Sequence, residues 1–300
     1  MESRTRRRVS GMLVASLLGA ICAVGIAHGA AGRAEQSGVF ALLGGTPRVS
    51  AKFWVSSPEV LSGTSASRSL SATLKVRQFG ADGKPVLNYD VDMEHTMHMI
   101  VVRDDFATFA HVHPNFDPAT GTFSQEFTRE PNRRYYVYAD STPHGLPQQV
   151  FRFMLGGPGP LADSRLVFAP SDPAAEAGPY NVTLSHTTIV AAQPHDLDLT
   201  VLENGRPAQN LAPYLGAAAH VVLINTVSLA YVHLHPALRG TDDEHTSMSA
   251  GMNMAESTEA KSGPLMSIAV PALPAGTYKM WVQFLGNGTL YTVPFTLLAR

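Results

Sequence analysis

Residues 97–114 read MHMIVVRDDFATFAHVHP, and residues 219–236 read AHVVLINTVSLAYVHLHP. Aligned without a gap, the two stretches share four identities, which are three histidines and one proline. A duplication that keeps its imidazoles while most other side chains change indicates that the imidazoles have a function. The identical pairs are His98 with His220, His111 with His233, His113 with His235, and Pro114 with Pro236.

Strand geometry gives this spacing its meaning. Side chains at i and i+2 lie on the same face of a strand, so His111 and His113 point the same way. The alternate residues, Ala110 and Val112, are small apolar groups that suit a core. The second repeat has the same alternation, and the pattern predicts one histidine-bearing face per repeat.

A hairpin would bring the third histidine to the other two. If residues 97–102 and 109–114 pair around Arg103–Thr108, His98 lies opposite His111 or His113. Cross-strand Cβ atoms are ~4.5–5.5 Å apart, which lets imidazoles share one ion at ~2.0–2.1 Å. Histidine is the commonest ligand of borderline metals, so we expect two metal sites, one per repeat. Candidate fourth ligands are water, Asp140 or His144 in the first repeat and Gln283 or Asn287 in the second.

The rest of both repeats consists of short β-branched and aromatic runs separated by turn residues. This pattern predicts an all-β protein with two tandem immunoglobulin-like β-sandwich domains after an N-terminal signal segment. No long stretch shows helical periodicity with caps at both ends. The expected ranges are a signal peptide or membrane anchor at 1–30, a flexible leader at 31–67, a first sandwich at 68–156, a Pro/Gly linker at 157–179, and a second sandwich at 180–300 that carries a disordered insertion at 241–263.

The N-terminus predicts the compartment. Four arginines among residues 4–8 precede an apolar stretch at 11–27, and small residues follow, as in a secretory signal peptide. Seventeen residues are marginal for spanning ~30 Å of hydrocarbon, so an inner-membrane anchor is the alternative. Export to the periplasm or the exterior is therefore expected. Cys22, the single cysteine, lies inside this stretch, which excludes disulfides and thiolate metal sites from the mature chain.

Charge argues against nucleic acid as a partner. The full chain has a net charge of −2, and loss of residues 1–30 removes four arginines and one glutamate, which leaves −5. No arginine-rich run remains in the mature part. A membrane contact is expected only if residues 11–27 are retained.

Methionines indicate which metal the histidines bind. Residues 92–99 contain three thioethers and two imidazoles, and thioether is a soft ligand that favours Cu(I). Copper is therefore the expected ion, with zinc as the alternative. Methionine also fills cores, so the methionines beside His98 have a second interpretation. The further candidate ligands are His95, Met97 and Met99 near the first repeat and His245, Met248, Met252 and Met254 in the insertion.

Catalytic signatures are scarce. The sequence has no G-x-S-x-G, no H-E-x-x-H and no phosphate loop. Cleavage after Ala27 would expose His28 as an N-terminal copper ligand, which is the one enzymatic arrangement left.

The motif resembles a group of exported bacterial β-sandwich domains, the YtkA-like and related heavy-metal-associated families. The first repeat matches their pattern M-H-x-x-V-V…F-x-H-x-H-P at Met97, His98, Phe109, His111 and His113. The second repeat matches through its histidines but lacks the aspartates that follow Val102 in the first. The resemblance covers about residues 70–299 and implies a cell-envelope role near copper or heavy-metal efflux.

These observations predict an exported metal-binding protein that buffers or delivers copper without catalysis. An envelope efflux system or a cuproprotein is the partner that such a role implies. The first alternative is a structural or interaction module in which the histidines brace strand ends by hydrogen bonds. The second is a copper or zinc enzyme.

Overall fold

The two histidine-bearing stretches fold as the predicted hairpins. In the first, β4 (His98–Arg103) pairs with β5 (Phe109–Val112), and in the second, β16 (His220–Asn225) pairs with β17 (Tyr231–Leu234). The computed structural model describes residues 48–64, 67–156, 167–239 and 262–300, where every regular element is a β-strand. This confirms the all-β class. Within these residues no helix has the length and apolar character needed to span a membrane.

The N-terminal sandwich, residues 48–156, consists of two sheets. One has the order β1-β2-β7-β6, and the other has the order β3-β8-β4-β5 with β9 paired to β8. Leu74 and Phe123 from the first sheet meet Met99 and Val137 from the second in a common core. The remaining strands are β1 (Ser50–Thr64), β2 (Ser67–Phe79), β3 (Tyr89–Asp90), β6 (Asn115–Asp117), β7 (Thr122–Arg129), β8 (Tyr135–Pro143) and β9 (Gln149–Leu155).

The C-terminal sandwich, residues 167–300, repeats this plan. Its sheets have the orders β10-β11-β13-β19-β18, with β14 on β13, and β12-β21-β20-β16-β17, with β15 on β20. Leu199 and Ile268 from one sheet meet Val221 and Val282 from the other. The remaining strands are β10 (Ala174–Ala177), β11 (Tyr180–Leu184), β12 (Thr188–Ile189), β13 (His195–Glu203), β14 (Arg206–Pro207), β15 (Leu211–Ala212), β18 (Ala237–Leu238), β19 (Leu265–Val270), β20 (Gly276–Gly286) and β21 (Thr289–Ala299).

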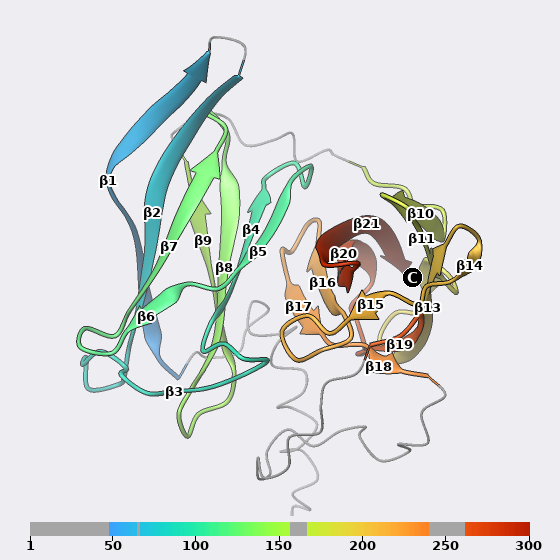
Figure 1. Ribbon diagram of the computed structural model, residues 1–300. Coiled ribbons are helices and arrows are strands. Elements are labelled where there is room, and N and C mark those ends of the chain that lie inside the picture. The colour runs from blue at the N-terminus through green and yellow to red at the C-terminus, as the bar shows by residue number, and fades with distance from the viewer. Residues whose placement is uncertain (1–47, 65–66, 157–166, 240–261) are drawn as a thin grey trace, which may run out of the picture.

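The two sandwiches pack against each other through the sheets that carry the hairpins. Figure 1 shows β4 and β5 of one sandwich beside β16 and β17 of the other. A third apolar cluster fills this interface and takes Ile100 and Tyr138 from one side and Val222 and Trp281 from the other. Because both faces of these sheets are covered, all six residues of β16 are buried. The four sheets therefore form one stack with three apolar layers.

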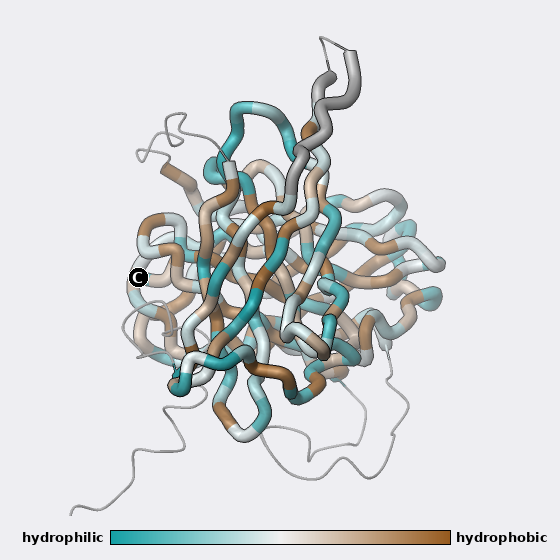
Figure 2. The backbone as a smooth tube through the Cα atoms, turned by 90° about the vertical axis from the view of Figure 1, so that its left-hand side faces the viewer, coloured by the Kyte–Doolittle hydropathy of each residue, from teal (hydrophilic) through white to brown (hydrophobic). Residues whose placement is uncertain are grey.

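The outer sheet of the N-terminal sandwich has only one covered face. Brown and teal segments alternate along its strands in Figure 2, as a half-solvated sheet requires. In β1, Phe53 and Val55 pack on the core, whereas Lys52 is exposed. This alternation is the reason that a stretch rich in glycine and serine still forms a strand.

Two expected boundaries are wrong. The leader expected at 31–67 contains β1, which pairs with β2 over most of its length. The linker expected at 157–179 contains β10, an edge strand that pairs with β11, so the second sandwich includes residues before 180. Composition did not reveal these strands, because residues 31–67 are rich in Gly, Ser and Ala and residues 157–179 are rich in Pro, Gly and Ala. The signal peptide at 1–30 and nearly all of the insertion at 241–263 lie outside the described residues.

Candidate metal centre

Strand parity places the histidines at the interface between the sandwiches. In β4, His98, Ile100 and Val102 face the C-terminal sandwich, while Met99 and Val101 face the core of their own sandwich. The same alternation runs through β5, where Ala110 and Val112 pack on the core and His111 lies on the opposite face. The histidines therefore lie between the two sandwiches.

The N-terminal trio, His98, His111 and His113, converges as the hairpin predicts. One ring nitrogen of each residue lies within 4.8 Å of one ring nitrogen of each of the others. His98 Nδ1 is 3.0 Å from His111 Nε2, and His98 Nε2 is 3.0 Å from the carbonyl oxygen of Asp92. His111 Nδ1 is 2.9 Å from Oε1 of Gln283, which belongs to the other sandwich.

The C-terminal trio, His220, His233 and His235, repeats the contacts of the first two histidines of the N-terminal trio. His220 Nδ1 is 3.2 Å from His233 Nε2, and His220 Nε2 is 2.9 Å from the carbonyl oxygen of Tyr214. The ring of His235 lies with its centroid 4.7 Å from each of the other two ring centroids. His233 Nδ1 faces Oδ2 of Asp140 in the N-terminal sandwich at 3.9 Å.

Matching turns position His98 and His220. Asp92 bridges to His95, and Tyr214 bridges to Ala217, so each turn has two central residues. All four central residues have positive φ: 42° at Met93, 70° at Glu94, 50° at Leu215 and 74° at Gly216. Turns of this two-residue type are the ones that join antiparallel segments closely. Each turn directs the carbonyl oxygen of its first residue to the Nε2 atom of the following histidine.

The two trios lie side by side in one cluster, and the expectation of two metal sites, one per repeat, stays a prediction. Ring nitrogens of His111, His220 and His233 all lie within 4.8 Å of one another, although His111 belongs to the other trio. The ring centroids of His98 and His233 are 5.0 Å apart, as are those of His111 and His233. Sequence spacing could not reveal this arrangement, because it arises from packing of the two sandwiches.

The hydrogen bonds around the cluster show which ring nitrogens carry a proton and which carry a lone pair. A carbonyl oxygen only accepts, so Nε2 of His98 and of His220 carries the proton and Nδ1 carries the lone pair. Gln283 Nε2 donates to Oγ1 of Thr292 at 2.9 Å, so its Oε1 accepts from His111 Nδ1. The lone pairs of His98 Nδ1 and His111 Nε2 thus face each other at 3.0 Å, an arrangement that a bound cation relieves.

Two further nitrogens have no partner. Nε2 of His113 and Nε2 of His235 are buried and have no hydrogen-bond partner among the described residues. They occupy equivalent positions in the two trios. The N-terminal trio therefore presents three donors, Nδ1 of His98 and Nε2 of His111 and His113, and Nε2 of His235 matches that of His113 in the C-terminal trio.

Burial keeps these imidazoles neutral. It lowers the pKa of all six histidines, to about 3 for His113 and His220 and about 4 for His235. Neighbouring imidazoles lower these pKa values further, since two adjacent rings resist carrying positive charge together. Metals bind the neutral form of histidine, so the cluster is in its ligating state at neutral pH.

Asp140 lies at the edge of the cluster and is fully enclosed. Its Oδ1 accepts a hydrogen bond from Gln148 Nε2 at 2.6 Å, and its Oδ2 accepts one from the hydroxyl of Tyr231 at 3.2 Å. Burial raises the pKa of Asp140 to about 7. Asp140 and Gln283 hold equivalent positions, because they pair in register with His98 and His220 respectively.

His95 adds a seventh imidazole on one side only. Its ring stacks on that of His113 with centroids 4.0 Å apart and planes inclined by 15°. Ala217 takes the corresponding place in the second turn. The first sandwich therefore contributes four histidines to the cluster, and the second sandwich contributes three.

Comparison with protein families gives one match. The model of a family described as "Domain of unknown function (DUF8832)" matches residues 59–154 and 175–300, which include both trios. The chain belongs to this family. Comparison with curated proteins gives no match. The resemblance to YtkA-like domains stays a prediction.

Four candidate ligands lie away from the cluster. Met97 and Met99 are buried in the core of the N-terminal sandwich on the opposite face of β4, so they fill space and do not ligate. His144 is exposed, and its Nδ1 is 2.7 Å from Asp90 Oδ1. In the second repeat, Asn287 lies in the turn between β20 and β21, where its backbone N–H donates to the carbonyl oxygen of Asn210. His245, Met248, Met252 and Met254 lie outside the described residues.

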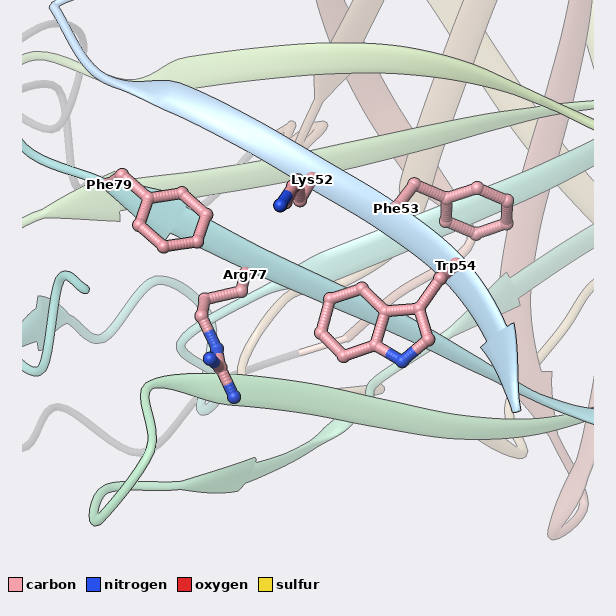
Figure 3. Close-up of a pocket in the computed structure, with 5 residues that line it drawn as sticks. All are labelled: Lys52, Phe53, Trp54, Arg77 and Phe79. Carbon is pink, nitrogen blue, oxygen red and sulfur yellow. The ribbon is translucent and has the colours of Figure 1, made fainter. Parts of the chain in front are cut away.

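Another hollow lies on the outer face of β1 and β2. It has a volume of about 470 Å³ and is lined by Lys52, Phe53, Trp54, Arg77 and Phe79 (Figure 3). The guanidinium of Arg77 lies 5.7 Å from the ring centroid of Trp54, and its Nη2 donates to Thr122 at 2.6 Å. None of the lining residues is a metal-ligating type, so the histidine cluster is the candidate site.

Proposed function

We propose that this protein binds copper in the cell envelope through the histidine cluster and buffers or delivers it without catalysis. The observation that carries the proposal is the convergence of six neutral imidazoles, of which two have an unpartnered Nε2 and two oppose their lone pairs. Leaving one buried polar group unsatisfied costs about 1–3 kcal/mol. Two such nitrogens and one pair of opposed lone pairs destabilise a permanently empty cluster, whereas bound metal would give these nitrogens a partner.

The spacing of the donors suits a transition metal. In each trio the first two donors are 3.0 and 3.2 Å apart. Two nitrogens bound to one tetrahedral ion at 2.0–2.1 Å are about 3.3 Å apart. Ligation therefore requires only small side-chain movements.

The choice of copper rests on ligand chemistry. Among divalent ions of the first transition row, copper binds nitrogen sites most tightly, and imidazole also accepts Cu(I). The mature chain has no thiol, because Cys22 lies in the apolar N-terminal stretch. Zinc fits an all-imidazole site as well and is the ion to compare. Export rests on the order of charged, apolar and small residues at the N-terminus.

A structural role is the second candidate, and one observation favours it. Nε2 of His98 and Nε2 of His220 donate to the carbonyl oxygens of Asp92 and Tyr214 and so brace two turns. Such bonds orient a ligating histidine equally well, since metal-bound histidines usually donate their other ring N–H to an acceptor. Bracing does not account for the unpartnered Nε2 atoms of His113 and His235.

Metal analysis of the purified chain tests the proposal. The protein is loaded separately with copper and zinc, dialysed and analysed. We expect copper to be retained, and to be lost when His111, His113, His233 and His235 are all replaced by Gln. The matched control is His144→Gln, an exposed histidine outside the cluster, which should retain copper like the wild type. Wild-type protein that retains neither metal would contradict the proposal and favour the structural role.

A further inference from the structure

We propose that the cluster holds two metal ions as one dinuclear centre across the interface, with Gln283 and Asp140 positioning the middle histidine of the opposite trio. This inference rests on the proposed function, because it specifies how the metal is bound. It also makes the two sandwiches a single metal-binding unit.

The first argument is the number and arrangement of donors. The two trios correspond residue by residue: Nδ1 of the first histidine lies 3.0 or 3.2 Å from Nε2 of the second, and the third has an unpartnered Nε2. A single four-coordinate ion would leave at least two of the six nitrogens without a partner. Two ions, each with three imidazoles and one open position, use all six.

The second argument is distance. One ring nitrogen of His111 lies within 4.8 Å of ring nitrogens of both His220 and His233. With metal–nitrogen bonds of ~2.0–2.1 Å, the ions of the two trios lie on the order of 10 Å apart or less. Two Cu(II) ions at such a separation interact magnetically, which provides a direct measurement.

The third argument is that each trio is completed by the other sandwich. Gln283 from β20 accepts from Nδ1 of His111, and Asp140 from β8 faces Nδ1 of His233. Partners of this kind fix the tautomer and the orientation of a ligating histidine, and losing one typically lowers metal affinity 10–100-fold. Neither sandwich alone contains a complete site.

Aromatic pairs cross the interface in the same reciprocal way. Phe109 of β5 stacks on Trp281 of β20 with centroids 4.8 Å apart, and Tyr231 of β17 stacks on Tyr138 of β8 at 5.1 Å. In each pair a residue two positions before the middle histidine contacts the opposite sandwich. Such reciprocity is the signature of a two-fold interface between equal subunits. The stacks hold the sandwiches in the register that the dinuclear centre requires.

Copper titration of the full chain, followed by electron paramagnetic resonance, tests the dinuclear centre. We expect two Cu(II) ions per chain, with a broadened signal that integrates to clearly fewer than two spins. His113→Gln and His235→Gln each remove an Nε2 atom that has no hydrogen-bond partner, so no hydrogen bond of that atom is lost and both variants should fold. Each should bind one ion and give a sharp signal of one full spin.

The outcomes separate this inference from the proposed function. Two ions with two full, unbroadened spins would mean independent sites, and one ion in the wild type would mean a mononuclear site. Either result overturns the dinuclear centre and leaves metal binding intact. Retention of no metal overturns both.

The positioning of His111 by Gln283, which belongs to the opposite sandwich, is tested in the His235→Gln background. In this background only the N-terminal trio keeps all three histidines. Adding Gln283→Leu should weaken copper binding about 10–100-fold, although Gln283 belongs to the other sandwich. Gln283→Glu keeps an acceptor for His111 Nδ1 and should restore most of the affinity. Equal affinity in the Leu and Glu variants would overturn the positioning role, with Tm used to confirm that both are folded.

Discussion

The two trios have the same internal geometry and different surroundings. The N-terminal trio has a seventh imidazole, His95, and its middle histidine bonds the neutral amide of Gln283. The C-terminal trio has Ala217 in place of His95, and its middle histidine faces the carboxyl group of Asp140. Duplication therefore preserved the donors, and the groups around them diverged. With the proposed function, the difference predicts that the two trios bind metal with unequal affinity.

The largest expected effect is on the apo protein at low pH. Burial lowers the pKa of the six histidines, so the unfolded chain binds more protons than the folded one below about pH 6.5. Stability therefore falls as pH drops from about 7 toward 4, by several kcal/mol in order of magnitude. Asp140 acts oppositely, because its raised pKa makes the folded state bind the extra proton, but it is one group against six. Urea unfolding at several pH values measures the slope, and the variant without His111, His113, His233 and His235 should show a much smaller one.

The next largest effect is expected on the copper-dependent rise in Tm when one trio is removed. A ligand at a hundredfold excess over Kd stabilises the native state by about 2.7 kcal/mol per site. His111→Gln with His113→Gln should remove the contribution of one site to the copper-dependent rise in Tm, and His233→Gln with His235→Gln should remove the other. An apo protein destabilised by 1–3 kcal/mol per lost partner, with no copper effect on the wild type, would instead identify bracing.

Tyr231 and Tyr138 offer a matched pair of smaller changes. Tyr231 donates to buried Asp140, whereas its stacking partner Tyr138 donates to the carbonyl oxygen of Leu229. Tyr231→Phe should cost about 1–3 kcal/mol and weaken copper binding at the C-terminal trio, since Asp140 loses a partner. Tyr138→Phe should change stability comparably and leave copper affinity unchanged. Equal copper affinities in the two variants would show that Asp140 does not influence the site.

The smallest effect is expected at His95. It stacks on His113 without belonging to either set of three donors. His95→Ala gives the first turn the same residue that the second turn has at Ala217. It should lower copper affinity of the N-terminal trio by only a few fold, as measured in the His235→Gln background. A hundredfold loss would make His95 a fourth ligand.

Much of the fold follows from local pattern. The predicted runs Phe109–Val112 and Tyr231–Leu234 coincide with β5 and β17, because alternation of apolar and polar residues is a property of the strand itself. The strands β1 and β10 were missed because the segments that contain them, 31–67 and 157–179, are rich in Gly, Ser, Ala and Pro. Continuous apolar runs in β4 and β16 were the available sign that both faces of these strands are covered.

The sequence by itself determined the all-β class, the duplication and the six histidines, since these depend on spacing along one chain. Tertiary structure alone decided that the two trios meet, that Gln283 and Asp140 cross to the opposite trio, and that Met97 and Met99 belong to a core. These facts depend on how two apolar sheet faces dock, and docking brings together residues more than a hundred positions apart. No spacing rule within either repeat contains that information.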